Sequence, residues 1–200
     1  MSKTQPAAAI RALVAAGQQA FGENYVQEAI AKQAELDDVP IQWHLIGPLQ
    51  SNKCGLAARH FDWIHSVDRP KLVPLLARAR PAARGPLQLL IQVNIDDEQS
   101  KSGCAPHDID ELAARIGAEP ALRLRGLMAI PAPAPEVDRR RDAFRRMHEL
   151  QSRLAATYPG IDTLSMGMSE DFELAITQGS TLVRIGSALF GTRAPATAAR

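Results

Sequence analysis

The segment LSMGMSEDFELAITQGSTLVRIGSALFG, residues 164–191, contains two successive strand-to-helix turns. In the first, an apolar strand at 163–165 runs through Gly167 into a helix that we expect to begin near Ser169. In the second, a strand at 182–185 breaks at Gly186, and a helix restarts at Ser187. A helix N-terminus offers free backbone N–H groups and the positive end of the dipole, so it can bind phosphate without a lysine.

The rest of the chain alternates short apolar runs with amphipathic helical patterns, which predicts a parallel sheet. The pattern indicates seven strands, at residues 20–22, 42–46, 63–66, 87–95, 126–130, 163–165 and 182–185. About 200 residues is the lower limit for eight βα units, and in such barrels the phosphate site often follows the last two strands. We therefore expect an α/β chain folded as a (β/α)8 TIM-type barrel over residues 1–192, with a flexible tail at 193–200.

Composition excludes several classes of protein. The net charge is +1 and no apolar run reaches membrane-spanning length, so we expect neither a nucleic-acid partner nor a membrane partner. No signal-peptide core is visible, and Cys54 and Cys104 are widely separated, which favours reduced thiols in a cytoplasmic protein. The five histidines show no metal-site spacing, and we expect no metal.

Polar residues gather where the predicted strands end, and barrel active sites lie at the carboxyl ends of strands. Structural roles compete with functional ones here. Ser51 and Asp68 are plausible helix caps, and His44 and His65 fit satisfied core histidines. Ser169, followed by two acidic residues, fits a helix N-cap, a role that is compatible with phosphate binding at the same helix end. Lys53 and Lys101 fit surface charges.

Several long segments together resemble the pyridoxal-phosphate homeostasis protein family, whose members resemble the barrel domain of alanine racemase standing alone. The matching segments are Ser2-Lys3-Thr4, Phe21-Gly22-Glu23-Asn24-Tyr25-Val26-Gln27-Glu28, His44 to Lys53, Ser66-Val67-Asp68, Val93-Asn94 through Glu98, Lys101 and Gly103-Cys104, Gly126-Leu127-Met128 to Pro131, and Leu164 to Gly191. The resemblance covers nearly the whole chain in order.

The resemblance implies pyridoxal 5'-phosphate as cofactor. It places the cofactor lysine at Lys3, whose amine would form a Schiff base with the pyridoxal aldehyde. It places phosphate ligands at Ser169 and at the backbone N–H groups of Gly186 and Ser187, and it places Asn24 near the ring oxygen. By analogy with alanine racemase Arg184 points toward the ring nitrogen, although a phosphate contact stays open.

The implied function is intracellular homeostasis of pyridoxal phosphate without substrate turnover, with cofactor-dependent apoenzymes as possible acceptors and a monomeric state. An arginine opposite the ring nitrogen keeps that nitrogen unprotonated and weakens the ring as an electron sink. The chief competing function is that of an amino-acid racemase, which draws a second base from a further domain that we do not expect here. A barrel enzyme for a different phosphorylated metabolite and an inert fragment also stay open.

The family carries a helix and most of a strand before its Ser-Lys-Thr segment, whereas here Met1 directly precedes Ser2. We therefore expect a barrel that lacks its first helix and most of strand 1. Such a barrel would be less stable than a longer form and would hold the cofactor weakly or not at all.

Overall fold

In the computed structural model, which describes residues 1–98, 102–132 and 136–191, seven parallel strands form one curved sheet. The strands pair in chain order, and the expected barrel-type α/β architecture is confirmed. The strands are β1 (Ala20–Glu23), β2 (Gln42–Leu45), β3 (Trp63–Val67), β4 (Leu87–Gln92), β5 (Leu122–Met128), β6 (Thr163–Met168) and β7 (Leu182–Arg184).

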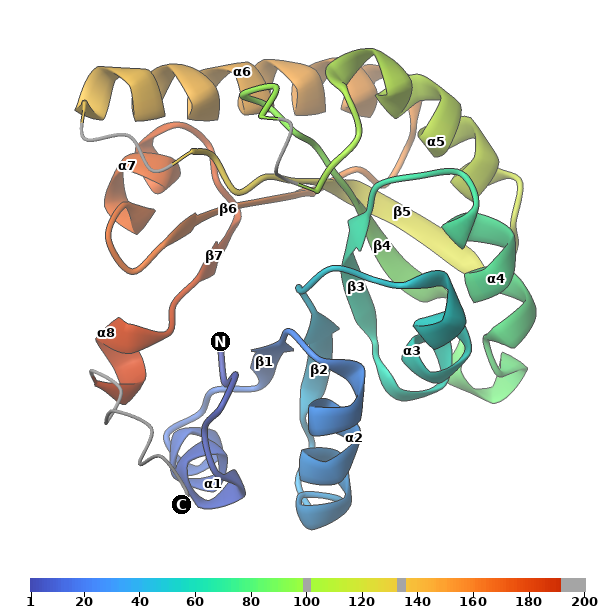
Figure 1. Ribbon diagram of the computed structural model, residues 1–200, viewed down its shortest axis with the longest axis vertical. Helices are drawn as coiled ribbons and strands as arrows, with labels where there is room; N and C mark the ends of the chain where they lie inside the picture. The colour runs from blue at the N-terminus through green and yellow to red at the C-terminus, as the bar shows by residue number, and fades with distance from the viewer. Residues whose placement is uncertain (99–101, 133–135, 192–200) are drawn as a thin grey trace, which may run out of the picture.

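Helices follow the strands and cover the outside of the sheet (Figure 1). The α-helices are α1 (Ala7–Ala15), α2 (Val26–Glu35), α3 (Cys54–His60), α4 (Leu72–Ala79), α5 (Ile109–Gly117), α6 (Val137–Thr157), α7 (Phe172–Thr177) and α8 (Ser187–Phe190). Three short 3-10 helices lie at Ser51–Lys53, Ala82–Arg84 and Pro106–Asp108. Among the described residues, no helix combines the length and the apolarity needed to cross a bilayer.

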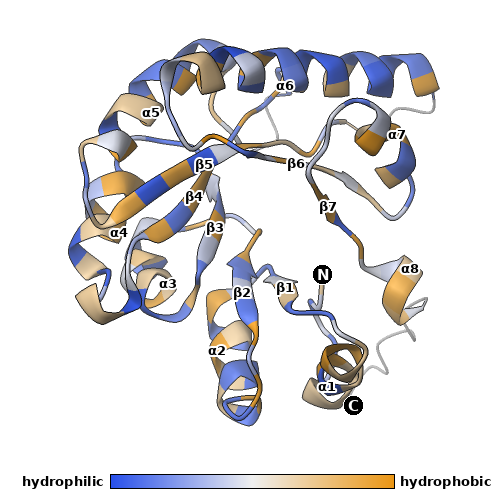
Figure 2. Cartoon of the chain, turned by 180° about the vertical axis from the view of Figure 1, so that it is seen from behind, coloured by the Kyte–Doolittle hydropathy of each residue, from blue (hydrophilic) through white to orange (hydrophobic). Residues whose placement is uncertain are grey.

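Burial follows the hydrophobic pattern of the sequence. The apolar centre of β4, residues 89–91, is fully buried, as expected of a strand covered on both faces. On α5 the residues Ile109, Leu112, Ala113 and Ile116 recur at helical spacing, and all four are buried against the sheet. The longest helix, α6, is mainly hydrophilic and lies along the outside (Figure 2).

The sheet stays open between β1 and β7, which do not pair with each other among the described residues. The N-terminus lies in this gap (Figure 1). The Met1 ammonium donates to the Ile185 carbonyl, and the Ser2 backbone N–H donates to the Gly22 carbonyl at 2.9 Å. Residues 1 and 2 therefore bridge the two sheet edges, and a cavity of about 200 Å³ opens beside Met1 and extends to Arg184.

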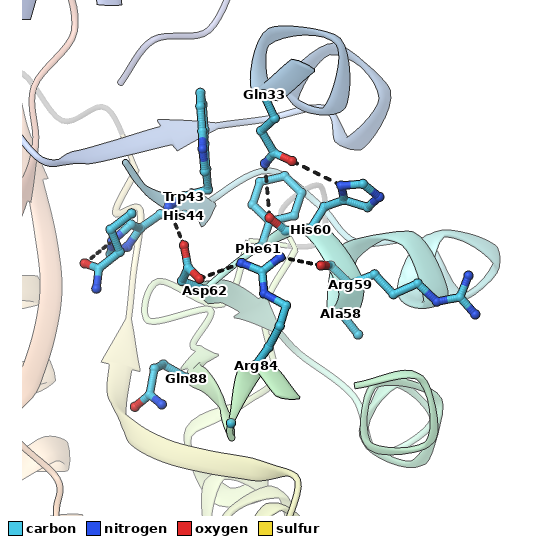
Figure 3. Close-up of polar contacts among 12 residues, drawn as sticks. Gln33, Trp43, His44, Ala58, Arg59, His60, Phe61, Asp62, Arg84 and Gln88 are labelled. Carbon is cyan, nitrogen blue, oxygen red and sulfur yellow. Dashed lines mark hydrogen bonds and ion pairs between the residues drawn. The ribbon is translucent and has the colours of Figure 1, made fainter. Parts of the chain in front are cut away.

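Polar contacts also lie before the amino ends of β2 and β3, where they involve α2, α3 and Arg84 (Figure 3). The Asp62 carboxylate accepts from the Trp43 backbone N–H at 2.9 Å and from the Arg84 guanidinium at 2.8 Å. Gln33 and His60 pair through two hydrogen bonds of 3.1 and 3.2 Å. Asp62 thus joins β2 to the 3-10 helix at Ala82–Arg84, and the Gln33–His60 pair joins α2 to α3.

Several predicted boundaries were wrong in detail. The strand expected at 87–95 ends at Gln92, and the one expected at 126–130 occupies Leu122–Met128. Asp68 does not cap α4, which begins at Leu72, because its carboxylate pairs with Arg69 at 2.5 Å. Ser51 is not at a capping position either, because Gln50 precedes the 3-10 helix and Lys53 precedes α3. Lys101 and the tail at 193–200 lie outside the described residues.

Candidate functional site

The segment that carries Lys3 is held by a buried cluster of ionic groups from β1 and α2. The Ser2 hydroxyl donates to the Glu23 carboxylate at 2.6 Å, and the Thr4 backbone N–H donates to Glu28 at 2.7 Å. Lys32 joins the two carboxylates, at 2.9 and 2.8 Å, and donates to the Ser2 carbonyl at 2.8 Å. We call Glu23, Glu28 and Lys32 the N-terminal clamp, since together they fix the backbone on both sides of Lys3.

Electrostatics reinforce the clamp. Burial raises the pKa of Glu28, but the hydrogen bonds from Lys32 and from the Thr4 backbone outweigh it, so the pKa lies below its ordinary value. Glu23 is fully buried, and Lys32 is 7% exposed. Because Lys32 is bound to two carboxylates and a carbonyl, its lone pair is not available to attack a carbonyl compound.

Lys3 itself is half-buried and reaches over the ring of Tyr25, with its ammonium 5.4 Å from the ring centroid. Tyr25 follows Asn24 at the carboxyl end of β1, so the lysine amine lies on the side of the barrel where parallel strands end. The backbone of Asn24 packs against Gly47, where an added Cβ would come within 2.2 Å of the Asn24 carbonyl oxygen. A glycine is required there for the β1 and β2 loops to meet.

Ser169 occupies a different position from the one predicted. The strand β6 runs on to Met168 and α7 begins only at Phe172, so Ser169 does not cap that helix. Gly167, with φ at +92°, turns the chain here. The Ser169 hydroxyl instead accepts from the backbone N–H groups of Gly186 at 3.2 Å and Ala188 at 3.4 Å. The two expected phosphate turns thus meet at one oxygen.

Arg184 lies at the end of β7 and points into the barrel interior. Its side chain is buried, and its guanidinium donates to the Ser165 hydroxyl at 2.7 Å and to the Ala129 carbonyl at 2.9 Å. Complete burial lowers the pKa of Arg184 to about 10, although the charge of Asp171 opposes the shift. The group therefore stays a cation at neutral pH, and it lines the cavity that opens between β1 and β7.

The predicted residues form one continuous region around Met1. The Met1 ammonium donates a hydrogen bond to the Ile185 carbonyl. Met1 also lies beside Gly186, where an added Cβ would be 3.7 Å from the Met1 side chain. Gly186 contacts Ser169, and Arg184 lies two residues before Gly186 on the same chain. Lys3 lies two residues after Met1. The structure therefore brings Lys3, Ser169, Arg184, Gly186 and Ser187 to the β1/β7 side of the barrel, with Asn24 beside Lys3.

Several buried polar atoms at the carboxyl ends of the strands lack hydrogen-bond partners among the described residues. They include Glu23 Oε2, Asn24 Oδ1 and Ser66 Oγ. Three further atoms without a hydrogen-bond partner in the described part of the chain lie on α6, but the three named above lie where the strands end, at a position where a bound polar ligand or water could pair with them. Together with an amine, a buried cation and two convergent N–H donors, this donor set fits a small anionic aldehyde.

Sequence reasoning missed part of this region. The clamp residues Lys32 and Glu28 carry no motif of their own, although the i,i+4 spacing of Glu28 and Lys32 on a helix could have indicated an ion pair. Ser165 and Ala188 were also missed, because their contacts join strands and turns far apart in the chain. His44 and His65 are buried and hydrogen-bonded, as predicted for core histidines. Cys54 and Cys104 are free thiols.

Comparison with known proteins gives a consistent result. The family described as alanine racemase, N-terminal domain, matches residues 4–194. The pyridoxal phosphate homeostasis protein of Pseudomonas aeruginosa is 56% identical over 193 residues, which cover 96% of this chain and 83% of that protein. The protein of the same name from Escherichia coli K12 is 54% identical over 196 residues, 96% of this chain and 84% of that one.

Solved structures with similar folds include PipY and an alanine racemase. PipY of Synechococcus elongatus without PLP superposes with a TM-score of 0.89 at 42% identity, covering 95% of this chain and 90% of PipY. PipY with PLP bound gives a TM-score of 0.86 at 41% identity and the same coverage. Alanine racemase of Corynebacterium glutamicum, at 19% identity and a TM-score of 0.62 over 49% of its length, shares the fold.

Proposed function

This chain belongs to the alanine racemase N-terminal domain family, and within it to the pyridoxal phosphate homeostasis proteins, and from that premise we propose that it binds pyridoxal 5'-phosphate and takes part in its homeostasis. The observation that supports the proposal is that Met1, two residues before Lys3, donates to Ile185, next to the turn at 186–188 that donates to Ser169. A relative of the same fold at 41% identity is described with PLP bound.

Each residue has a role that follows from its chemistry. Lys3 supplies an amine that the clamp holds in place, while Lys32 is occupied by carboxylates. When bound, the cofactor supplies an aldehyde carbon that condenses with such an amine and releases water. Ser169 and the N–H groups of Gly186 and Ser187 would bind the phosphate, since Ser169 already lies against this turn and accepts from the N–H groups of Gly186 and Ala188.

The remaining two residues face the ring. Asn24 lies beside Lys3 on the β1 loop, and its unpaired side-chain oxygen marks a polar position toward the ring oxygen once the amide is oriented to donate. Arg184 would hold the ring nitrogen side of the cofactor, because its cationic side chain lines the cavity and is fixed by Ser165. A permanent cation at that point would oppose protonation of the ring nitrogen and would make the ring a poor stabiliser of a carbanion.

We therefore infer that the chain stores or transfers the cofactor as a cytoplasmic monomer without substrate turnover of its own. An amino-acid racemase is the second candidate, favoured by the fold shared with alanine racemase. Incubation with L-alanine at saturating cofactor distinguishes them. We expect no racemisation, whereas turnover near the usual enzyme range of about 1–1000 per second would establish the racemase.

Titration of the purified chain with pyridoxal 5'-phosphate, followed by visible absorbance and by dialysis, tests binding itself. We expect saturable absorbance that disappears in Lys3→Met and that dialysis reduces more readily in this chain than in a form extended upstream. Lys53→Met serves as the matched control, because Lys53 lies in a 3-10 turn after β2. Absence of saturable binding, or equal binding by Lys3→Met and the unaltered chain, would contradict the proposal.

A further inference from the structure

A line of hydrogen-bonded side chains crosses the barrel interior from Arg184 to the amino end of β2. Arg184 Nη1 lies 2.7 Å from Ser165 Oγ, which lies 3.2 Å from His65 Nδ1. His65 Nε2 is 2.9 Å from His44 Nδ1, and His44 Nε2 is 3.0 Å from Gln42 Oε1. Five residues from four strands thus form one chain, which we call the histidine relay.

Donor and acceptor chemistry gives the relay a direction. A guanidinium can only donate, so Ser165 Oγ accepts from Arg184 and gives its single hydrogen to His65 Nδ1. His65 must then be protonated at Nε2 and donate to His44 Nδ1, and His44 Nε2–H donates to Gln42. The reverse direction would leave the Ser165 hydrogen without an acceptor among the described residues and would need the Gln42 amide turned over.

Burial supports two neutral rings. His65 is fully buried and His44 is 5% exposed. Burial, followed by the nearby His44 and Arg184, places the pKa of His65 well below its ordinary value. Burial likewise lowers the pKa of His44 to about 4. The His44 ring is also stacked on Trp63, with centroids 5.3 Å apart and planes 8° from parallel, which fixes its orientation.

We propose that His65, oriented by His44, is a positioning residue for Arg184: its unprotonated Nδ1 keeps the Ser165 hydroxyl turned so that its lone pairs face the guanidinium. This inference rests on the proposed function, in which Arg184 faces the cofactor ring. Without an acceptor at Nδ1 the hydroxyl hydrogen would rotate, and Nη1 would lose its fixed acceptor. The guanidinium, held otherwise by the Ala129 carbonyl, would then be free to turn in the cavity.

The first test needs no cofactor. Nitrogen-15 NMR of histidine-labelled protein at neutral pH reports which ring nitrogen carries hydrogen. We expect both His44 and His65 to be neutral Nε2–H tautomers, assigned by comparison with His44→Gln and His65→Asn. A charged His65, or an Nδ1–H tautomer at either ring, would overturn the direction of the relay and the proposal with it.

The second test compares two replacements of His65. His65→Asn keeps an acceptor near the Nδ1 position, and His65→Leu removes it. We expect His65→Asn to retain the absorbance maximum of bound pyridoxal phosphate and an affinity within about three-fold, and His65→Leu to shift the maximum and weaken binding about ten-fold. His60→Leu, which also loses one side-chain hydrogen bond but outside the barrel interior, is the control and should match the unaltered chain.

Outcomes separate this inference from the proposed function. If the unaltered chain binds no cofactor, the proposed function fails, and the NMR tautomers still decide whether the relay exists. If it binds and His65→Leu keeps the same maximum and affinity, the positioning role is refuted. Should His65→Leu fail to fold, Ser165→Ala replaces it, because that change removes the acceptor of Arg184 directly, and an unchanged maximum there would equally refute the proposal.

Discussion

Two buried arginines on opposite sides of the barrel, Arg80 and Arg184, are satisfied to different degrees. Arg80 donates four hydrogen bonds to main-chain carbonyls, those of Ala58, Phe61, Arg84 and Gly85, at 2.7–3.1 Å. Among the described residues Arg184 donates two, and it lines a cavity. Neither arginine forms an ion pair with a carboxylate among the described residues.

The difference separates structural from functional burial of charge. Arg80 lies on the α3–α4 side, near the contacts drawn in Figure 3, and four hydrogen bonds from its five N–H donors link main-chain segments. Arg184 lies on the open β1/β7 side, where the unpaired Glu23 Oε2 and Asn24 Oδ1 at the end of β1 also lie. A buried cation with most of its donors unused beside a cavity is suited to a ligand site, whereas one with most of its donors used stabilises the fold.

The largest expected effect is on the closed side. Arg80→Met would leave four carbonyls without their donor, and we expect the free energy of unfolding to fall by about 3–5 kcal/mol. Urea unfolding measures the loss. Arg115→Met is the control, because Arg115 forms an exposed pair with Glu111 whose loss should cost below about 1 kcal/mol. A loss below about 1 kcal/mol for Arg80→Met would remove the contrast between the two arginines.

On the open side, a strand that pairs with both β1 and β7 should stabilise the fold. An upstream extension able to form a strand between β1 and β7 should raise the free energy of unfolding by about 3 kcal/mol, at about 1 kcal/mol for each of a few new backbone hydrogen bonds. It should also tighten cofactor binding, since Lys3 would follow a paired strand. Equal denaturant midpoints and equal affinities for the two forms would show that the open edges of β1 and β7 reduce neither stability nor cofactor binding.

Acid should lower the free energy of unfolding through His44 of the histidine relay. The pKa of His44 is about 4 when folded, because of burial, and about 6.5 when unfolded. The unfolded chain then binds more protons between these values, so stability falls as pH drops from about 6.5 to 4, by about 3 kcal/mol for His44 alone. Asp62 raises this pKa and the N-terminal ammonium lowers it. His44→Gln should reduce the dependence of the urea midpoint on pH over this range. An unchanged dependence would contradict the argument that burial lowers the pKa of His44.

A smaller effect is expected at the phosphate turn. Ser169→Ala removes the oxygen at which the Gly186 and Ala188 N–H groups converge. We expect weaker binding of pyridoxal phosphate by about 1–3 kcal/mol with an unchanged absorbance maximum, since ring contacts persist. Calorimetric titration gives the affinity, with Ser152→Ala on α6 as the control. Unchanged affinity would mean that Ser169 only joins two turns of the apo fold.

The sequence predicts much of this molecule because local signals govern its strands and helices. Alternating apolar runs such as β4 and amphipathic helices such as α5 are read directly from spacing. The relay could not be predicted, because His65 and Ser165 are 100 residues apart and meet only through the barrel's curvature. Ser169 was assigned to its own helix for the same reason, since its partner turn comes 17 residues later.

The identity of the cofactor-bearing lysine tests the central claim most directly. The chain has five lysines, and Lys3 lies within the clamp on the open side of the barrel. Borohydride reduction of the chain saturated with pyridoxal phosphate, followed by peptide mass mapping, fixes the adduct in place. The account predicts that the modified peptide contains Lys3. A stoichiometric adduct at Lys32, Lys53, Lys71 or Lys101, with Lys3 unmodified, would contradict it.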